Sequence, residues 1–155
     1  TLPEDSTGIC HIIEHSLLCG SKKYPTKEPF VNLLKGSMAT FLNAMTAYDW
    51  TMYPVASQNN QDFNNLVSVY MDAVFAPLSI LEDKAFLQEG WHLEMTDLEA
   101  TPSYKGVVYN EMKGAMSSVE EQLTQLTLSS LYKGSCYEHN SGGDPEVIPN
   151  LTFEY

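Results

Sequence analysis

The sequence of 155 residues contains no arginine, and its eight basic side chains are all lysines, against 20 aspartates and glutamates. Proteins that bind the phosphate backbone of nucleic acids need clustered cations, so a net charge of −12 excludes nucleic acid as a partner. Without guanidinium groups, the chain also has no bidentate donor for a carboxylate, a phosphate or an oxyanion. The excess of carboxylates from Glu82 onward favours a cationic partner, although a solvated acidic surface accounts for the same residues.

The sequence also lacks long apolar runs and an even set of cysteines. No run approaches the roughly 18 apolar residues that a membrane span requires, so we expect no span. Residues 1–5 contain no basic region followed by an apolar stretch, and no secretory signal is visible. The three cysteines do not suit a disulfide framework. Because the first residue is Thr1 rather than methionine, we expect the chain to be a piece of a longer polypeptide.

The run His11-Ile12-Ile13-Glu14-His15 has the pattern H-x-x-E-H. Two histidines four residues apart on a helix point in directions only about 40° apart around its axis, so both can bind one Zn²⁺. A glutamate three residues after the first histidine can reach a water molecule beside the metal. The pattern therefore predicts a hydrolytic zinc site.

The surrounding residues predict a helix over 9–18. This stretch has no proline or interior glycine, residues 6–8 offer caps, and Gly20 follows its end. A His-x3-His pair alone is common on helices and usually carries no function. Here Glu14 stands at the required offset on an otherwise apolar helix, which favours a metal site over a buried cluster of polar groups that satisfy one another.

Periodicity and turn residues predict an α+β fold. We expect further helices over 30–35, 60–76, 82–89, 104–116 and 120–132. Two strands over 40–46 and 50–55 should form a hairpin, a further strand is expected over 91–95, and turns over 140–145.

A catalytic zinc ion takes three protein ligands, so a third ligand is needed. The candidates are His92, His139 and the carboxylates. Glu111 lies in the apolar stripe predicted for the helix over 104–116, and a carboxylate on an inward face is rare unless it is paired or binds metal. By contrast, four other carboxylates lie near predicted helix starts, where a surface carboxylate is ordinary: Glu82, Asp83, Glu120 and Glu121. The pattern therefore favours Glu111.

The sequence around these residues resembles the pitrilysin or insulinase clan of zinc peptidases, whose motif inverts the order H-E-x-x-H. The resemblance is strongest to the presequence-protease subfamily and extends over essentially the whole chain. It is carried by residues 8–21, 23–25, 41–46, 53–57, 69–75, 88–91, 106–114 and 141–145.

The resemblance implies a role for each matching residue. It implies that His11, His15 and Glu111 bind zinc and that Glu14 is the general base. Asn43 and Ala44 match an edge strand to which a bound peptide is added as a further strand. Leu18 and Phe30 match positions that line an apolar substrate pocket, although core packing accounts for both equally well.

The resemblance also implies what the whole protein does. Residues 1–155 would be the incomplete N-terminal catalytic domain of a two-half, clamshell-shaped peptidase with a pitrilysin-like fold, in which helices pack on a mainly antiparallel sheet. The enzyme would be a zinc endopeptidase acting on unfolded peptides, including basic targeting presequences. Its second half would supply substrate-binding and oxyanion-stabilising groups. Its location would be the mitochondrial matrix or a plastid in a eukaryote, and the cytoplasm in a bacterium.

Two alternatives remain open at this point. The chain could be a non-catalytic scaffold or peptide-binding member of the same fold. It could instead be a structural zinc module, in which case a fourth ligand such as Cys10 or His92 would close the coordination sphere.

Overall fold

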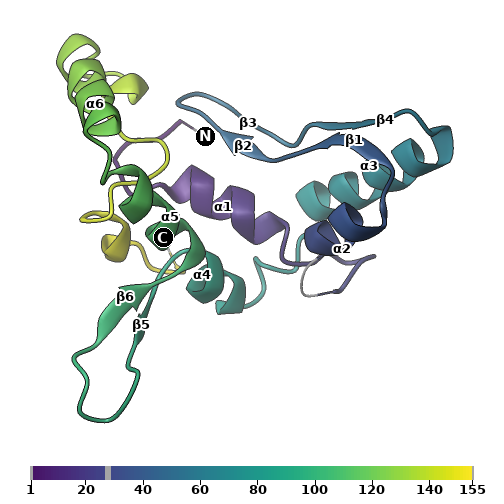
Figure 1. Cartoon of the computed structure of the whole chain (residues 1–155), viewed down its shortest axis with the longest axis horizontal. Coiled ribbons are helices and arrows are strands. Elements are labelled where there is room, and N and C mark those ends of the chain that lie inside the picture. The colour runs from purple at the N-terminus through teal and green to yellow at the C-terminus, as the bar shows by residue number, and fades with distance from the viewer. Residues whose placement is uncertain (1, 27–28, 155) are drawn as a thin grey trace.

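Helix α1 (Ile9–Leu17) lies at the centre of the fold, and the other elements are arranged around it (Figure 1). The structure is a computed structural model that describes residues 2–26 and 29–154, without the side chains of Pro29, Phe30 and Leu34. The other helices are α2 (Pro29–Gly36), α3 (Asn60–Phe75), α4 (Lys84–Glu89), α5 (Val107–Ala115) and α6 (Val119–Leu131), with short 3-10 turns η1 (Cys136–Glu138) and η2 (Ile148–Asn150). The strands are β1 (Ala39–Leu42), β2 (Met45–Thr46), β3 (Thr51–Met52), β4 (Val55–Ser57), β5 (His92–Glu94) and β6 (Ser103–Lys105).

The buried core joins α1 to α5 and to the C-terminal segment. Ile12 of α1 is 3% exposed and packs in one cluster with residues of α5 and of the segment around η2. The buried members of this cluster are Ile12, Val108, Tyr109, Met112, Ile148 and Leu151. Trp91 borders the cluster and donates a hydrogen bond from its indole nitrogen to the carbonyl oxygen of Leu151 at 2.9 Å. This packing fixes the position of α5 relative to α1.

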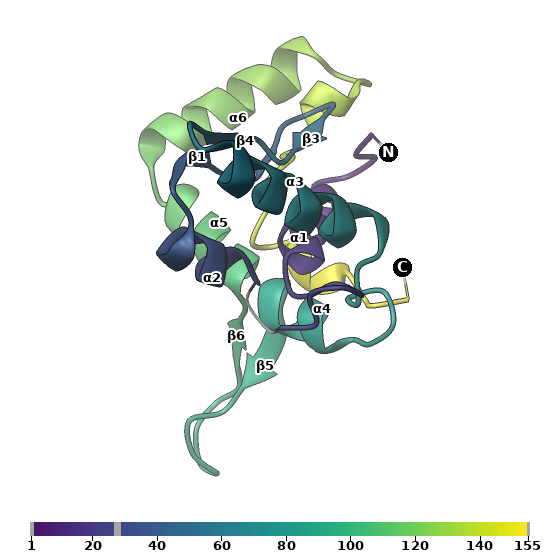
Figure 2. The same cartoon turned by 90° about the vertical axis from the view of Figure 1, so that its right-hand side faces the viewer.

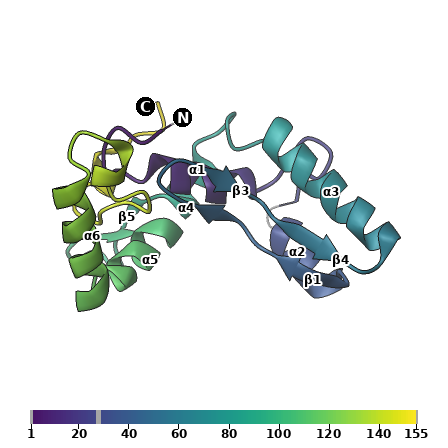
Figure 3. The ribbon, with the colours of Figure 1, turned by 90° about the horizontal axis from the view of Figure 1, so that it is seen from above.

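A long β-hairpin lies across α1 and reaches toward α2 and α3 (Figure 3). Strand β1 pairs with β4, and β2 pairs with β3, both antiparallel. The pairing is interrupted at Pro54, which has no N–H to donate, although its carbonyl accepts a hydrogen bond from the N–H of Asn43 at 3.1 Å. On the other side, α3 packs against β4, and the hydroxyl of its buried Tyr70 donates to the Asn43 carbonyl at 3.3 Å.

The strands β5 and β6 form a second antiparallel hairpin that extends away from the rest of the protein (Figure 2). The described residues thus contain three separate two-stranded sheets, all antiparallel, together with the helices. This arrangement confirms the predicted α+β class. Within the same residues, no helix combines the length and the apolar character that a bilayer crossing requires.

The helices over 9–18, 30–35, 60–76, 82–89 and 120–132 form within two residues of their predicted limits. The helix over 104–116 was predicted to begin too early, because residues 103–105 form β6. Gly106 separates strand from helix with φ +145, and its Cα packs so closely on Gly90 that an added Cβ would collide with the Gly90 carbonyl. Tyr104, which fits the helical period, contacts the rings of Trp91 and Tyr109 from the strand instead.

Replacing Ile12 with alanine tests the dependence of the fold on the α1–α5 core. The substitution removes a fully packed side chain, and we expect the free energy of unfolding to fall by about 2–5 kcal/mol. Ile13→Ala is the matched control, because Ile13 is on the same helix but 48% exposed, and should cost about 1 kcal/mol or less. Urea unfolding followed by circular dichroism measures both. Equal losses in the two variants would contradict the assignment of the core.

Candidate metal centre and active site

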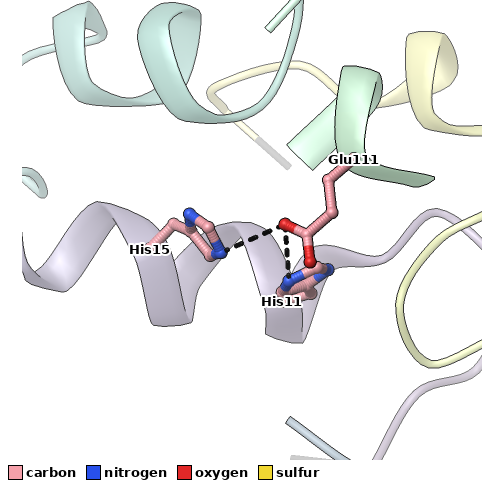
Figure 4. Close-up of side chains that lie close together, drawn as sticks. All are labelled: His11, His15 and Glu111. Carbon is pink, nitrogen blue, oxygen red and sulfur yellow. Dashed lines mark ion pairs between the residues drawn. The ribbon is translucent and has the colours of Figure 1, made fainter. Parts of the chain in front are cut away.

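Three side chains from two helices face one another (Figure 4). His11 and His15 lie on α1, and Glu111 lies on α5. Nε2 of His11 is 3.8 Å from Oε2 of Glu111, and Nε2 of His15 is 3.7 Å from the same oxygen. The three ligand atoms all lie within 4.8 Å of one another, so one metal ion could lie between them. Two imidazoles and a carboxylate are a ligand set that suits Zn²⁺ with an open fourth position.

Hydrogen bonds orient both imidazoles toward this point. Nδ1 of His11 is 2.9 Å from the carbonyl oxygen of Gly142, and Nδ1 of His15 is 3.2 Å from Oε2 of Glu89. Both partners are acceptors, so in each neutral ring the proton belongs on Nδ1 and the lone pair on Nε2. The lone pairs therefore face Glu111, which is the tautomer that metal binding requires. The residues present fit a zinc ion.

The loop around Gly142 reaches His11 because two glycines allow a close approach. Gly8 precedes α1 with φ +70, and an added Cβ there would lie 2.7 Å from the Gly142 carbonyl oxygen. The N–H of Asp144 donates to the Ser6 carbonyl at 2.8 Å and fixes the loop beside the helix start. Residues 6–8 were expected to offer a cap, and Gly8 is the N-cap of α1, without a side-chain hydrogen bond at this position. The predicted turns over 140–145 thus help to build the site.

The environment of His15 is strongly acidic. Burial disfavours the charged imidazolium, but the hydrogen bond to Glu89 and the charges of Glu14 and other nearby carboxylates outweigh burial and raise the pKa of His15. Burial would likewise raise the pKa of Glu89, yet hydrogen bonds from His15, Gln88 and Cys19 lower it below its usual value. Glu89 is therefore an ionised carboxylate. Such surroundings favour a cation at this point.

Glu14 is 4% exposed and lies between the two histidines on α1. Its backbone carbonyl accepts a hydrogen bond from the hydroxyl of Tyr53 at 3.3 Å. Burial and the nearby Glu14 charge raise the pKa of Tyr53, so the phenol stays protonated and can keep donating. This contact ties the motif helix to the β-hairpin that crosses it.

A pocket of about 310 Å³ opens beside Glu14 and His15. Its wall also contains three of the four residues expected to contact substrate: Leu18, Asn43 and Ala44. Further lining comes from Val31 of α2, Cys19, Gln88, Glu89 and Val107. The pocket is large enough for one or two side chains of a bound peptide.

The placement of the expected substrate residues differs in detail from the prediction. Asn43 and Ala44 do not lie within a strand but in the gap between β1 and β2, where Oδ1 of Asn43 accepts the N–H of Ala44 at 2.9 Å. Phe30 lies in α2, and its side chain is outside the described part of the structure. The roles of Leu18, Phe30, Asn43 and Ala44 in substrate binding stay predictions.

The structure corrects the reason given for Glu111. Val108 and Met112 form the buried face of α5, whereas the Glu111 side chain is 54% exposed and lies at the edge of that face. It was not predicted from the sequence that Glu89 would lie against His15. Glu89 lies at the end of a short predicted helix, where nothing in the local sequence indicates burial. Only the family resemblance over residues 88–91 points to it.

The two residues expected to close a structural zinc site do not join the ligand group. Within the described residues, that group consists of His11, His15 and Glu111, without Cys10 or His92. Nδ1 of His92 instead lies 2.7 Å from the carbonyl oxygen of Leu87.

Several known proteins are similar to this chain over nearly its whole length. It is 58% identical to presequence protease 1, chloroplastic/mitochondrial, of Arabidopsis thaliana. It is 56% identical to protein HypA of Clostridium perfringens and 49% identical to the mitochondrial presequence protease of mouse. Each match covers 99% of this chain but only 14–16% of the relative, so the chain spans about one seventh of the length of these proteins.

The fold is also similar to that of a protein of known structure. The crystal structure of pitrilysin matches 97% of this chain with a TM-score of 0.65 and 23% sequence identity, over 15% of the pitrilysin chain. At the level of sequence, residues 3–134 match the family described as Insulinase (Peptidase family M16). The chain therefore belongs to the insulinase family of peptidases, peptidase family M16.

Proposed function

We propose that this chain carries the zinc site of an endopeptidase that hydrolyses unfolded peptides. The observation that carries the proposal is the convergence of His11, His15 and Glu111, with both Nε2 atoms facing the same carboxylate oxygen. Membership of a peptidase family and the pocket beside the buried Glu14 support the same function.

The residues of the site divide into metal ligands and a base. The ion would be held by His11, His15 and Glu111. The acceptors that face Nδ1 of each histidine would keep both rings in the tautomer that binds metal. Zinc, when bound, supplies Lewis acidity that polarises a carbonyl group and acidifies water.

Glu14 acts as the general base. Its carboxylate takes a proton from the attacking water and delivers it to the nitrogen of the leaving amine as the peptide bond breaks. Glu14 is buried on the wall of the pocket, so its carboxylate is shielded from bulk solvent. A purely structural zinc module is less well supported, since the ligand group found among the described residues contains neither Cys10 nor His92.

The chain would work as part of a longer polypeptide. It spans 14–16% of the length of its relatives, which include presequence proteases of mitochondria and chloroplasts. By this similarity, the substrates would be unfolded peptides such as targeting presequences, and the acidic composition suits basic ones. The setting would be the mitochondrial matrix or a plastid, or the cytoplasm if the source is bacterial, as the similarity to a clostridial protein allows.

The first test concerns the metal. We expect the chain to bind one zinc ion, and His11→Ala, His15→Ala or Glu111→Ala to weaken binding by more than the roughly 10–100-fold that loss of an outer partner costs. His92→Ala is the matched control and should bind zinc as the parent does. Metal analysis and competition with a chelator measure stoichiometry and affinity. Loss of zinc in His92→Ala would point to a closed structural site instead.

The second test concerns the base. Glu14→Gln preserves the size of the side chain but removes its capacity to accept a proton, so we expect zinc to be retained. Peptide hydrolysis by the longer polypeptide should fall by about 10²–10⁴-fold. Glu99→Gln, an exposed site on the loop between β5 and β6, removes the same charge and should leave hydrolysis unchanged. Normal turnover in Glu14→Gln would exclude Glu14 as the base.

The third test compares the chain with the longer polypeptide. The chain has no arginine to stabilise an oxyanion, and we expect it to bind zinc yet cleave a fluorogenic peptide far more slowly than the longer polypeptide does. Rates measured at equal zinc occupancy provide the comparison. Equal rates would mean that residues 1–155 contain the complete catalytic apparatus.

A further inference from the structure

Glu89 is a buried charge that the hydrolytic chemistry does not use. It is 8% exposed and is the last residue of α4. The C-terminal end of a helix carries partial negative charge, so a carboxylate there is disfavoured, and burial adds a desolvation cost. Local structure therefore gives no reason for an acidic residue at this position, and its contacts elsewhere must account for it.

The two carboxylate oxygens of Glu89 have different partners. Oε1 accepts hydrogen bonds from Nε2 of Gln88 at 2.7 Å and from Sγ of Cys19 at 3.4 Å. Oε2 lies 3.2 Å from Nδ1 of His15. The donors on Oε1 fix the plane of the carboxylate, and this leaves Oε2 directed at the imidazole.

The backbone around Glu89 is fixed by the same junction that begins α5. The next residue, Gly90, packs against Gly106, and its carbonyl accepts the N–H of Tyr109. Helix α4 also packs on α1. The segment that presents Glu89 to His15 is thus joined to the helix that presents Glu111 to the same histidine.

We infer that Glu89 is a positioning residue of the metal centre, which holds His15 with its proton on Nδ1 and its Nε2 lone pair directed at the ion. A carboxylate in this position also makes the imidazole a stronger ligand, since it stabilises the positive charge that develops on the ring when it binds metal. The inference rests on the proposed function, because it takes His11, His15 and Glu111 to be zinc ligands.

The two histidines differ in a way that makes the inference testable. The outer acceptor of His11 is a backbone carbonyl, that of Gly142, which no side-chain substitution removes. The outer acceptor of His15 is the Glu89 side chain. A substitution of Glu89 therefore removes the hydrogen-bond partner of His15 without removing a proposed metal ligand.

The experiment compares Glu89→Leu and Glu89→Gln in the 155-residue chain. Leucine removes the acceptor, and we expect zinc affinity, measured by chelator competition, to fall by about 10–100-fold. Glutamine keeps an acceptor oxygen without the charge, so its affinity should lie between those of Glu89→Leu and the parent. Glu94→Gln and Glu94→Leu at the exposed end of β5 are the matched controls and should match the parent.

A second measurement reports on the tautomer itself. Nitrogen-15 NMR of the zinc-free chain at alkaline pH, where imidazoles are neutral, should show His15 with its proton on Nδ1. Glu89→Leu should shift this equilibrium toward Nε2–H, whereas Glu89→Gln should preserve it. Loss of stability alone would not move the tautomer in a folded chain.

The outcomes separate the inference from the proposed function. Parent-like zinc affinity in Glu89→Leu would overturn the inference and leave the zinc site intact. If Glu89→Leu does not fold, a parent spectrum with the His15 proton on Nε2 would still overturn it, and a proton on Nδ1 would support it. Failure of the parent chain to bind zinc would contradict the proposed function and the inference with it.

Discussion

The packing of α1 on α5 is the interaction on which the site depends. Ile12 is buried against Val108 and Met112, and this contact brings together two helices nearly a hundred residues apart in the sequence. On the neighbouring face of α1, His11 and His15 then meet Glu111 from α5. The hydrophobic core and the candidate metal site lie on adjacent faces of the same pair of helices, so the packing of the core sets the geometry of the site.

Close contacts between glycines position the groups that form hydrogen bonds with the two histidines. Gly106 lies against Gly90, and Gly8 lies against Gly142. The first contact connects the end of α4, with Glu89, to the start of α5. The second brings the Gly142 carbonyl to His11. Both histidines therefore donate their Nδ1 hydrogen bonds to segments held by glycine contacts rather than to α1 itself.

Local sequence was sufficient where the determinants are local. The spacing of His11, Glu14 and His15 and the absence of helix breakers predicted the motif helix. The helical period also selected Glu111, but on the premise that its side chain faces the core, whereas that side chain is 54% exposed. Prediction from local sequence failed where contacts between distant residues determine the structure. Tyr104 fits a helical period, but the Gly90–Gly106 contact ends β6 and delays the helix. Glu89 meets a histidine 74 residues away, and no local pattern encodes that distance.

The polar side chains that line the pocket bear on how an oxyanion could be stabilised. Nε2 of Gln88 donates to Glu89 and so already serves the local structure, whereas Oδ1 of Asn43 accepts the N–H of Ala44 and so orients the Asn43 amide. The sequence offers no arginine. A tetrahedral oxyanion needs donors that are positioned in advance and not engaged elsewhere. In the proposed mechanism the ligands and the base lie on α1 and α5, and we propose that groups outside these 155 residues stabilise the developing charge, since the chain spans about one seventh of the length of its relatives.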